Sequence, residues 1–325
     1  MHPADRLLEP LVAHHRILLT GPVAPDGDSV GACLALQRVL RDRGCDVQVA
    51  GDLSYRYRAL PGAGGVLPDA SVLPDWGAVV VLDGDRHRLT APVAAAFAAA
   101  RFRGLIDHHA SSTPDGYDVA WISPESCSAT AMLAEAFDRW DVGLTAPLAE
   151  LLYAGIVFDT GGFRYSNTTP AIHALAARLL ATGFDHAALA ASMLVERREA
   201  GLRLAGEVYR TMQLHGGGRL AIGTVSLDQR AALGVVTGDL EGIVDALVHV
   251  VGVEVAALLV ERPDGIVKYS LRSRGRVDLL PLARRLSETG GGHSKAAGAT
   301  RQASLAEAHA AALAELEPAV LALAP

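Results

Sequence analysis

Acidic and imidazole side chains follow several apolar runs of this sequence, at the points where those runs end. Asp26 and Asp28 flank a glycine after the first run, and Asp83 ends "VVVLD". The triplet Asp-His-His at 107–109 ends "GLIDHH", and Asp159 follows the apolar run in "YAGIVFDTGGF". Carboxylates that converge without cations repel and raise one another's pKa values, and divalent metals resolve this conflict. These residue types therefore indicate a metal centre.

The ligand types also narrow the choice of metal. Carboxylates and imidazoles without a thiolate favour ions such as Mn²⁺ or Mg²⁺ over structural zinc. A bridging carboxylate can hold two metals about 3.5–4 Å apart, the spacing used for in-line attack on phosphoryl groups. Asp83 is the expected bridge because it follows a central strand. Each aspartate taken alone has a simpler interpretation as a helix N-cap or a turn residue, and only the whole set favours the metal.

Four short apolar runs predict the strands that position these groups. Each is bounded by Gly, Pro or Asp, and they occupy residues 16–20, 46–50, 78–82 and 104–106. A helical pattern that stops at Gly44 separates the first two. The alternation predicts an α/β fold with a doubly wound, mainly parallel sheet. In such sheets ligands bind outside the carboxyl ends of the strands, where the acids fall.

Composition and charge exclude several classes of protein. Half of the 325 residues are hydrophobic, which argues against disorder, and the net charge of −7 argues against coating long nucleic acid. Three widely spaced cysteines without a C-x-x-C motif fit a reducing cytoplasm. The sequence has no signal-peptide core and no uncharged apolar run of about 18 residues. We expect a cytoplasmic protein with no membrane segment and no long duplex partner.

The second half of the chain predicts a smaller α/β domain after a helical stretch at 196–212. Its strand-like runs are 220–226, 253–261 and 266–273. Residues 262–301 include nine basic and three acidic side chains, a net charge of +6. Within this segment, "SETGGGHSKAAGA" at 287–299 offers glycine N–H groups that can approach a phosphate closely. A flexible turn and a solvated basic face are the simpler alternatives.

Five motifs occur in an order that resembles the DHH phosphoesterase superfamily. They are Asp26-Gly27-Asp28, Asp83, Asp107-His108-His109, Asp159-Thr160-Gly161-Gly162-Phe163 and Gly290-Gly291-Gly292-His293. The stretches "SCSATAMLAE" (126–135) and "FRYSNTTP" (163–170) are also similar to a two-domain bacterial group of this superfamily, which has nanoRNase and 3′-phosphoadenosine 5′-phosphate phosphatase activity. The resemblance covers nearly the whole chain. It implies a DHH domain at 1–190, a linker helix at 191–210, a DHH-associated substrate-binding domain at 211–325, and an active-site cleft between the two domains.

The resemblance also implies a dinuclear Mn²⁺ site, in which Mg²⁺ or Co²⁺ could substitute. Asp26 and Asp83 would bind the first metal, and the second metal would be bound by Asp28, Asp83, His108 and Asp159. A metal-bound hydroxide would attack phosphorus. His109 would contact the scissile phosphate, and Asp107 would orient the histidines. The implied substrate-binding residues are Arg272, Ser273, Gly290, Gly291, Gly292 and His293.

The substrates implied by the resemblance are very short oligoribonucleotides such as pApA, 3′-phosphoadenosine 5′-phosphate, and linear products of cyclic dinucleotides. The protein would be an oligoribonuclease and a 3′(2′),5′-bisphosphate nucleotidase, and a homodimer is compatible with the sequence. An inorganic pyrophosphatase of the DHH type fits this sequence less well, because the second domain of that family lacks the GGGH loop found here. A RecJ-type exonuclease would need added DNA-binding parts.

Pro22 departs from the family pattern. The family motif usually reads His-x-x-Pro-Asp-x-Asp, and Pro22 occupies the position of that histidine, a ligand of the first metal. A proline side chain cannot coordinate a metal, so the first site is expected to be weakened. His14 and His15 are near in sequence, but a strand that rises about 3.3 Å per residue separates them from the site. The alternative function is a nucleotide- or cyclic-dinucleotide-binding protein with weak or no hydrolysis.

Overall fold

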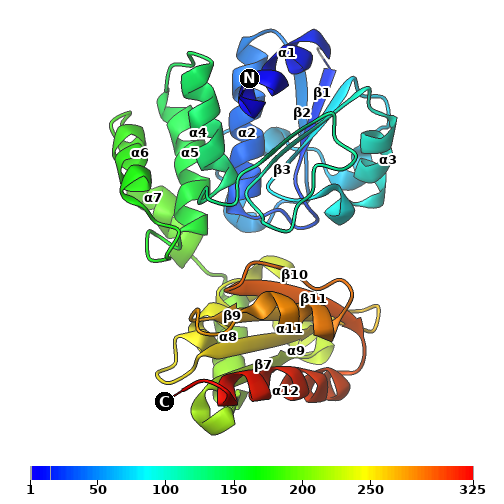
Figure 1. Cartoon of the computed structure of the whole chain (residues 1–325), viewed down its shortest axis with the longest axis vertical. Helices are drawn as coiled ribbons and strands as arrows, with labels where there is room; N and C mark the ends of the chain where they lie inside the picture. The colour runs from blue at the N-terminus through cyan, green and yellow to red at the C-terminus, as the bar shows by residue number, and fades with distance from the viewer. Residues whose placement is uncertain (1, 15, 325) are drawn as a thin grey trace. The chain divides into compact units, whose positions relative to one another are not determined.

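The computed structural model describes residues 2–14 and 16–324, so His15 lies outside the described residues. The chain forms two compact units, Met1–Glu196 and Arg197–Pro325, each with its own sheet and hydrophobic core (Figure 1). Within the described ranges, no helix is long and apolar enough to cross a membrane.

A five-stranded parallel sheet forms the centre of the N-terminal unit, in the order β2-β1-β3-β4-β5. Its strands are β1 (Arg16–Thr20), β2 (Asp46–Ala50), β3 (Ala78–Leu82), β4 (Phe102–Asp107) and β5 (Val119–Ile122). The first four strands confirm the predicted runs. The pattern does not predict β5, because this edge strand has only four residues and alternates between buried and partly exposed positions.

Helices cover both faces of this sheet, as the doubly wound prediction requires (Figure 1). One face packs against side chains of α1, α2, α4 and α5, and the other packs against α3. The helices are α1 (Pro3–His14), α2 (Gly27–Asp42), α3 (Ala91–Ala99), α4 (Ala129–Arg139), α5 (Ala146–Asp159), α6 (Pro170–Leu180) and α7 (His186–Ala190). The predicted stop at Gly44, φ 82°, is confirmed, and Thr169 is the N-cap of α6 before Pro170.

A six-stranded mixed sheet forms the centre of the C-terminal unit, in the order β10-β11-β9-β8-β7-β6. Its strands are β6 (Gln213–His215), β7 (Leu220–Val225), β8 (Val255–Glu261), β9 (Ile266–Ser273), β10 (Gly291–Gly292) and β11 (Ala296–Gln302). The three predicted runs are confirmed as β7, β8 and β9. The segment 287–299 contributes β10 and part of β11, which hydrophobic periodicity misses because glycine and alanine give little signal.

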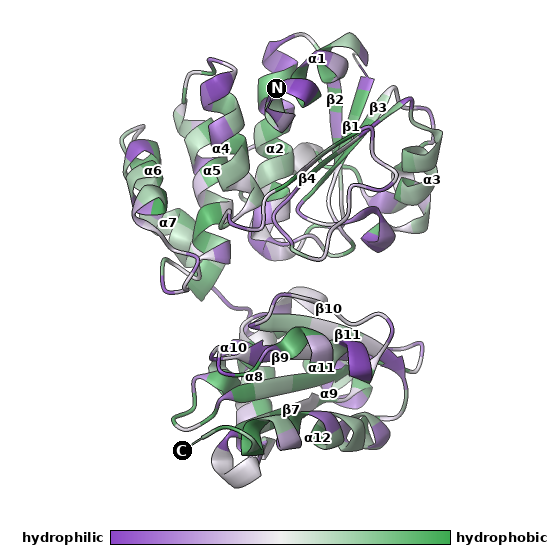
Figure 2. Ribbon diagram, viewed as in Figure 1, coloured by the Kyte–Doolittle hydropathy of each residue, from purple (hydrophilic) through white to green (hydrophobic). Residues whose placement is uncertain are grey.

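Helices also cover both faces of the second sheet. They are α8 (Glu199–Thr211), α9 (Leu227–Leu233), α10 (Ile243–Val248), α11 (Leu279–Leu286) and α12 (Leu305–Leu321). Side chains of α8 and α10 pack on one face, and those of α11 and α12 pack on the other. Figure 2 shows β7 largely in hydrophobic colours, and many of the hydrophilic residues lie in loops and on helix ends.

Candidate metal centre

The carboxyl ends of three strands bring the predicted acids to one edge of the parallel sheet. Asp83 follows β3, Asp107 ends β4, and the first turn of α2, after β1, carries Asp28. The Ser29 hydroxyl donates to the carbonyl of Leu82 at 3.2 Å, which ties the start of α2 to the end of β3. Strand order therefore makes neighbours of residues that are far apart in the sequence.

Asp83 has a left-handed backbone conformation, with a φ of 59°. Such a conformation is uncommon for a residue other than glycine and often marks a functional site. The Asp83 N–H donates to the carbonyl of Ile106 at 2.9 Å, which fastens this turn to β4. Because β3 is the middle strand of the sheet, Asp83 lies at the centre of this edge.

Three side chains converge on Asp83 and form a group of four with it. The ligand atoms of Asp28, Asp83, His108 and Asp159 all lie within 4.8 Å of one another. His108 Nε2 is 3.2 Å from Asp83 Oδ1 and 3.2 Å from Asp159 Oδ2. Asp159 reaches the group from the C-terminal end of α5, and a turn with three successive positive φ values (Gly161, Gly162 and Phe163) follows it.

The group contains more carboxylates than the neighbouring cationic side chains can neutralise. Burial, together with the charge of Asp26, raises the pKa of Asp83 well above its usual range. Burial and the charge of Asp28 do the same to the pKa of Asp159. Burial lowers the pKa of His108, but its contacts with Asp159 and Asp83 outweigh burial and raise that pKa to about 12. Without a metal, the His108 imidazolium is therefore the cation inside this cluster.

The residues present fit a divalent metal ion. The buried oxygens Asp83 Oδ1 and Asp159 Oδ2 both contact the single Nε2 of His108, and one N–H cannot satisfy two acceptors well. A cation placed among three carboxylates and one imidazole would satisfy both oxygens. Oxygen and imidazole donors without a thiolate suit ions such as Mn²⁺ or Mg²⁺.

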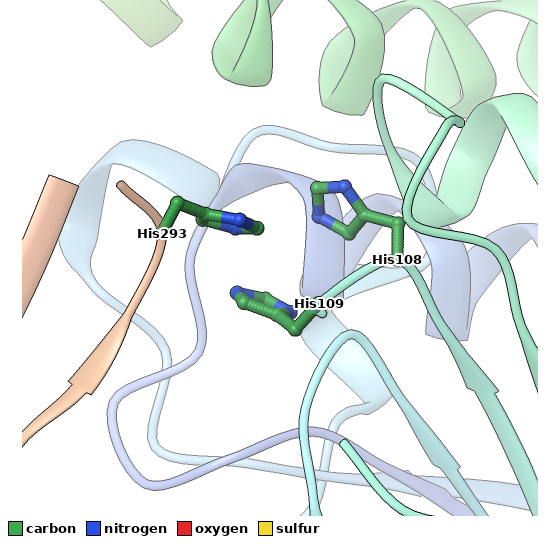
Figure 3. A group of neighbouring side chains, drawn as sticks. All are labelled: His108, His109 and His293. Carbon is green, nitrogen blue, oxygen red and sulfur yellow. The ribbon is translucent and has the colours of Figure 1, made fainter. Parts of the chain in front are cut away.

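A second group contains Asp83, Asp107 and His109, whose ligand atoms also lie within 4.8 Å of one another. Figure 3 shows His108 and His109 side by side on the loop after β4, and their ring centroids are 4.8 Å apart. Asp107 Oδ1 lies 2.8 Å from His109 Nδ1, and Ser112 Oγ donates to Asp107 Oδ2. Burial raises the pKa of Asp107, but its bonds to His109 lower it below the usual range. The ionised Asp107 therefore fixes the orientation of the His109 ring through its Nδ1.

Asp26 has a different environment from the other predicted ligands. Its Oδ1 accepts from the N–H groups of Asp28 and Ser29 at 3.0 and 3.1 Å, so it is the N-cap of α2. It belongs to neither group of converging ligand atoms in the described ranges. Its charge nevertheless acts on Asp83, as the raised pKa there shows. Asp26 is thus an N-cap, the simpler of the two interpretations of such an aspartate. It lies next to the cluster.

Pro22 is buried, and its ring packs against Gly84, the residue after Asp83. A Cβ added to Gly84 would lie 3.1 Å from Cδ of Pro22. His14 cannot replace the missing ligand, because it ends α1 and stacks on Phe102 at the amino end of β4. The carboxyl edge carries the acids, so His14 lies at the opposite edge, as predicted.

Asn167 is a supporting residue that the sequence reasoning did not single out. Its Nδ2 donates to the carbonyl of Asp159 at 3.1 Å and to that of Cys127 at 3.4 Å. It therefore ties the C-terminal end of α5 to the segment before α4. Only its position inside "FRYSNTTP" marks it in the sequence.

The predicted substrate-binding residues lie along one side of the C-terminal sheet. Arg272 Nε donates to Asp245 Oδ1 at 2.7 Å, and the buried Ser273 hydroxyl donates to the carbonyl of Val277 at 2.8 Å. Gly291 and Gly292 form β10, and Gly290 lies so close to α11 that a Cβ would be 2.1 Å from the carbonyl of Ala283. The turn at His293, whose N–H donates to Ala296, joins β10 to β11. Gly290 and Gly292 therefore allow tight packing of the hairpin, whereas a Cβ on Gly291 would meet nothing within 4 Å.

The fold and the site define a two-domain α/β protein with a metal-type cluster of carboxylates and imidazoles at the carboxyl edge of its parallel sheet. Residues 16–156 match the DHH family, N-terminal domain, and residues 217–320 match the DHHA1 domain. The chain belongs to the DHH family.

Two relatives cover most of the chain. The Thermus thermophilus protein named bifunctional oligoribonuclease and PAP phosphatase NrnA is 33% identical over 285 residues, which make up 87% of this chain and 83% of the relative. A Streptococcus mutans protein named probable bifunctional oligoribonuclease and PAP phosphatase NrnA is 28% identical over 93% of this chain and 94% of its own length. The chain is accordingly an enzyme of the DHH phosphoesterase type.

A solved structure has the same fold over nearly the whole chain. It is an exopolyphosphatase-related protein from Bacteroides fragilis, with a TM-score of 0.85 and 24% identity. The match covers 98% of this chain and 97% of that protein.

Proposed function

We propose that the enzyme uses Mn²⁺ to hydrolyse very short oligoribonucleotides, such as pApA, and 3′-phosphoadenosine 5′-phosphate. The observation that carries this proposal is the convergence of Asp28, Asp83, His108 and Asp159 within 4.8 Å. The printed names of the two relatives support the choice of substrates. The binding-only alternative is not favoured, because both relatives are named as enzymes.

The four converging residues would hold the ions, with Asp83 as the shared carboxylate and Asp26 beside them. Bound metals would supply Lewis-acid chemistry, in which they lower the pKa of a water molecule and neutralise charge on phosphate oxygens. The chain itself would orient the substrate. His109, fixed by Asp107 at 2.8 Å, would contact the phosphate of the substrate. That contact would help to hold the phosphate in position for attack on phosphorus.

The C-terminal domain would bind the far end of the substrate through the turn at His293 and the strand that carries Arg272. This role, together with domain boundaries at 1–190, 191–210 and 211–325, stays a prediction. The short basic segment at 262–301, net +6, suits a nucleotide better than a long duplex.

The test is incubation of the purified protein with pApA, 3′-phosphoadenosine 5′-phosphate and a longer RNA, with Mn²⁺ in excess. We expect chromatography to detect AMP from the first two substrates and much slower loss of the third. Mg²⁺ and Co²⁺ in parallel reactions establish the metal preference. The absence of AMP at every Mn²⁺ concentration, with protein that is folded by circular dichroism, would contradict the proposal.

A further inference from the structure

The carboxylate of Asp28 is held by the first turn of α4. Ala129 N–H donates to Oδ2 at 2.6 Å, and Thr130 N–H donates to Oδ1 at 2.9 Å. The Thr130 hydroxyl adds a third bond, to Oδ1 at 2.7 Å. Both side chains are fully buried. The N-terminus of an α-helix favours a negative charge, so this turn stabilises Asp28 as a carboxylate.

The Ser128 hydroxyl extends the hydrogen-bond network of Thr130 and forms a relay of two hydroxyl groups. The Ser128 hydroxyl lies 2.9 Å from Thr130 Oγ1 and accepts from the N–H of Ala131 at 3.0 Å. The single Thr130 O–H donates to Asp28 Oδ1, so it cannot also donate to Ser128. Thr130 Oγ1 must then accept from Ser128, whose own oxygen accepts from the backbone. The relay therefore has one direction and ends on Asp28.

Helix α5 closes over this bond at Gly155. A Cβ on Gly155 would lie 2.2 Å from Asp28 Oδ1 and 2.3 Å from Thr130 Oγ1. The glycine leaves room for the carboxylate and the hydroxyl and for nothing larger. Neither group can swing away, because helices α2, α4 and α5 meet at this point.

We infer that Thr130 is a positioning residue that fixes Asp28 as a ligand of the metal centre. The inference rests on the metal-dependent function proposed above and extends it to a residue outside the predicted ligand set. A carboxylate offers about four acceptor positions, and the three donors from α4 use three of them. One position stays available to a cation. Groups that hold a ligand in place commonly change metal affinity by about 10- to 100-fold when removed.

The test compares Thr130→Val, which keeps the shape and removes the hydroxyl, with Thr130→Ser, which keeps the hydroxyl. Calorimetry measures Mn²⁺ affinity on variants that are folded by circular dichroism. We expect the valine variant to bind Mn²⁺ about 10- to 100-fold more weakly and the serine variant to restore most of the affinity. Thr182→Val is the matched control, because Thr182 bonds only to its own helix end at Leu179 and should leave Mn²⁺ affinity unchanged.

Ser128→Gly provides a second variant in case Thr130→Val does not fold. Glycine is tolerated at an N-cap, and this change removes the relay hydroxyl while it leaves the Thr130 hydroxyl in place. We expect a smaller loss of Mn²⁺ affinity in the same direction. Unchanged affinity in a folded Thr130→Val variant, or in Ser128→Gly when the first does not fold, overturns the inference.

Direct binding keeps this test separate from the test of activity. Wild-type protein that binds Mn²⁺ but releases no AMP would end the proposed function, and the comparison of variants would still decide the role of Thr130. Wild-type protein that binds no divalent ion would overturn the inference itself.

Discussion

Pro22 packs against Gly84, so the position that holds a histidine in the family motif lies beside the residue that follows Asp83. Residue 22 therefore lies beside the segment that carries Asp83, and its proline ring offers no ligand atom there. Pro22 is buried, and Asp26 caps α2 a few residues later. The proline at position 22 changes the ligand set of the first metal, while the chain keeps the fold of the Bacteroides fragilis protein.

Pro22→His should restore a ligand to this first site. We expect Mn²⁺ binding at the weaker site to tighten by about tenfold, or about 1.4 kcal/mol. Calorimetry and the Mn²⁺ dependence of turnover measure the change. Pro22→Ala is the control, because it removes the ring without adding a ligand and should not tighten binding. An unchanged Mn²⁺ dependence in the histidine variant would count against the missing-ligand argument.

Asp83→Asn should abolish metal-dependent turnover and stabilise the metal-free protein. Asparagine tolerates the φ of 59° as well as aspartate does, and it removes one charge from a buried acidic cluster. We expect the free energy of unfolding without metal to rise by about 0.5–2 kcal/mol, as changes at strained functional sites often do. Asp83→Ala should also abolish turnover.

Asp85→Asn makes the same charge change two residues away and outside the cluster. Asp85 caps a short helical turn by accepting from the N–H of His87 at 2.9 Å, and asparagine is an equally good N-cap. This control should keep both activity and stability. Activity within a few-fold of wild type in Asp83→Asn would show that Asp83 is not the shared ligand.

The strands and the acids at their ends can be predicted from the sequence because each is a local signal. Asp83 and Asp107 follow apolar runs, and the strand order brings them to one edge. Thr130 and Asn167 cannot be found in this way. Their roles depend on a helix N-terminus and a helix C-terminus that meet in space, and such contacts leave no periodic pattern.

The glycine loop at 290–292 shows the opposite difficulty. Its composition predicts an anion-binding or flexible loop; the backbone pairs as a short hairpin close to α11, and anion binding there stays a prediction. Glycine permits tight packing as readily as it permits ligand approach, and the sequence does not distinguish the two.

Gly155→Ala should weaken the Asp28 site by crowding. The added Cβ would lie 2.2 Å from Asp28 Oδ1, so the carboxylate or the helix must shift. We expect a loss of about 1–3 kcal/mol in unfolding free energy and weaker Mn²⁺ binding. Gly206→Ala in α8 is the control, because its Cβ meets nothing within 4 Å and should stabilise the protein by about 0.5–1 kcal/mol. Equal effects of the two changes would contradict the crowding argument.

Metal binding should release protons from the cluster. Without metal, the raised pKa of His108, about 12, keeps a proton bound to its imidazole at neutral pH. A metal must displace this proton, so we expect Mn²⁺ affinity to increase with pH, with about one proton released per ion. Calorimetry in two buffers with different ionisation enthalpies counts these protons. Affinity that does not change between about pH 6 and pH 8 would show that the cluster does not hold its protons there.

The C-terminal unit should lose stability in mild acid through His309. Burial and the neighbouring His215, whose ring centroid is 5.6 Å away, lower the pKa of His309. The unfolded chain therefore protonates His309 more readily than the folded chain does. The contribution of neutral His309 to stability is present above the ordinary histidine pKa of about 6.5 and is lost as pH falls through the lower pKa of the folded chain.

His309→Gln should make the chain less sensitive to acid than the wild type. Between about pH 7 and pH 5, the wild type should lose more unfolding free energy than the variant. The extra loss should reach up to about 1.4 kcal/mol for each unit by which folding lowers the pKa of His309. Denaturant titration of metal-free protein at each pH measures it. His249→Gln, at an exposed position in the same unit, is the control and should behave as the wild type does. Parallel stability curves for His309→Gln and wild type would show that the pKa of His309 does not differ between the folded and unfolded chain.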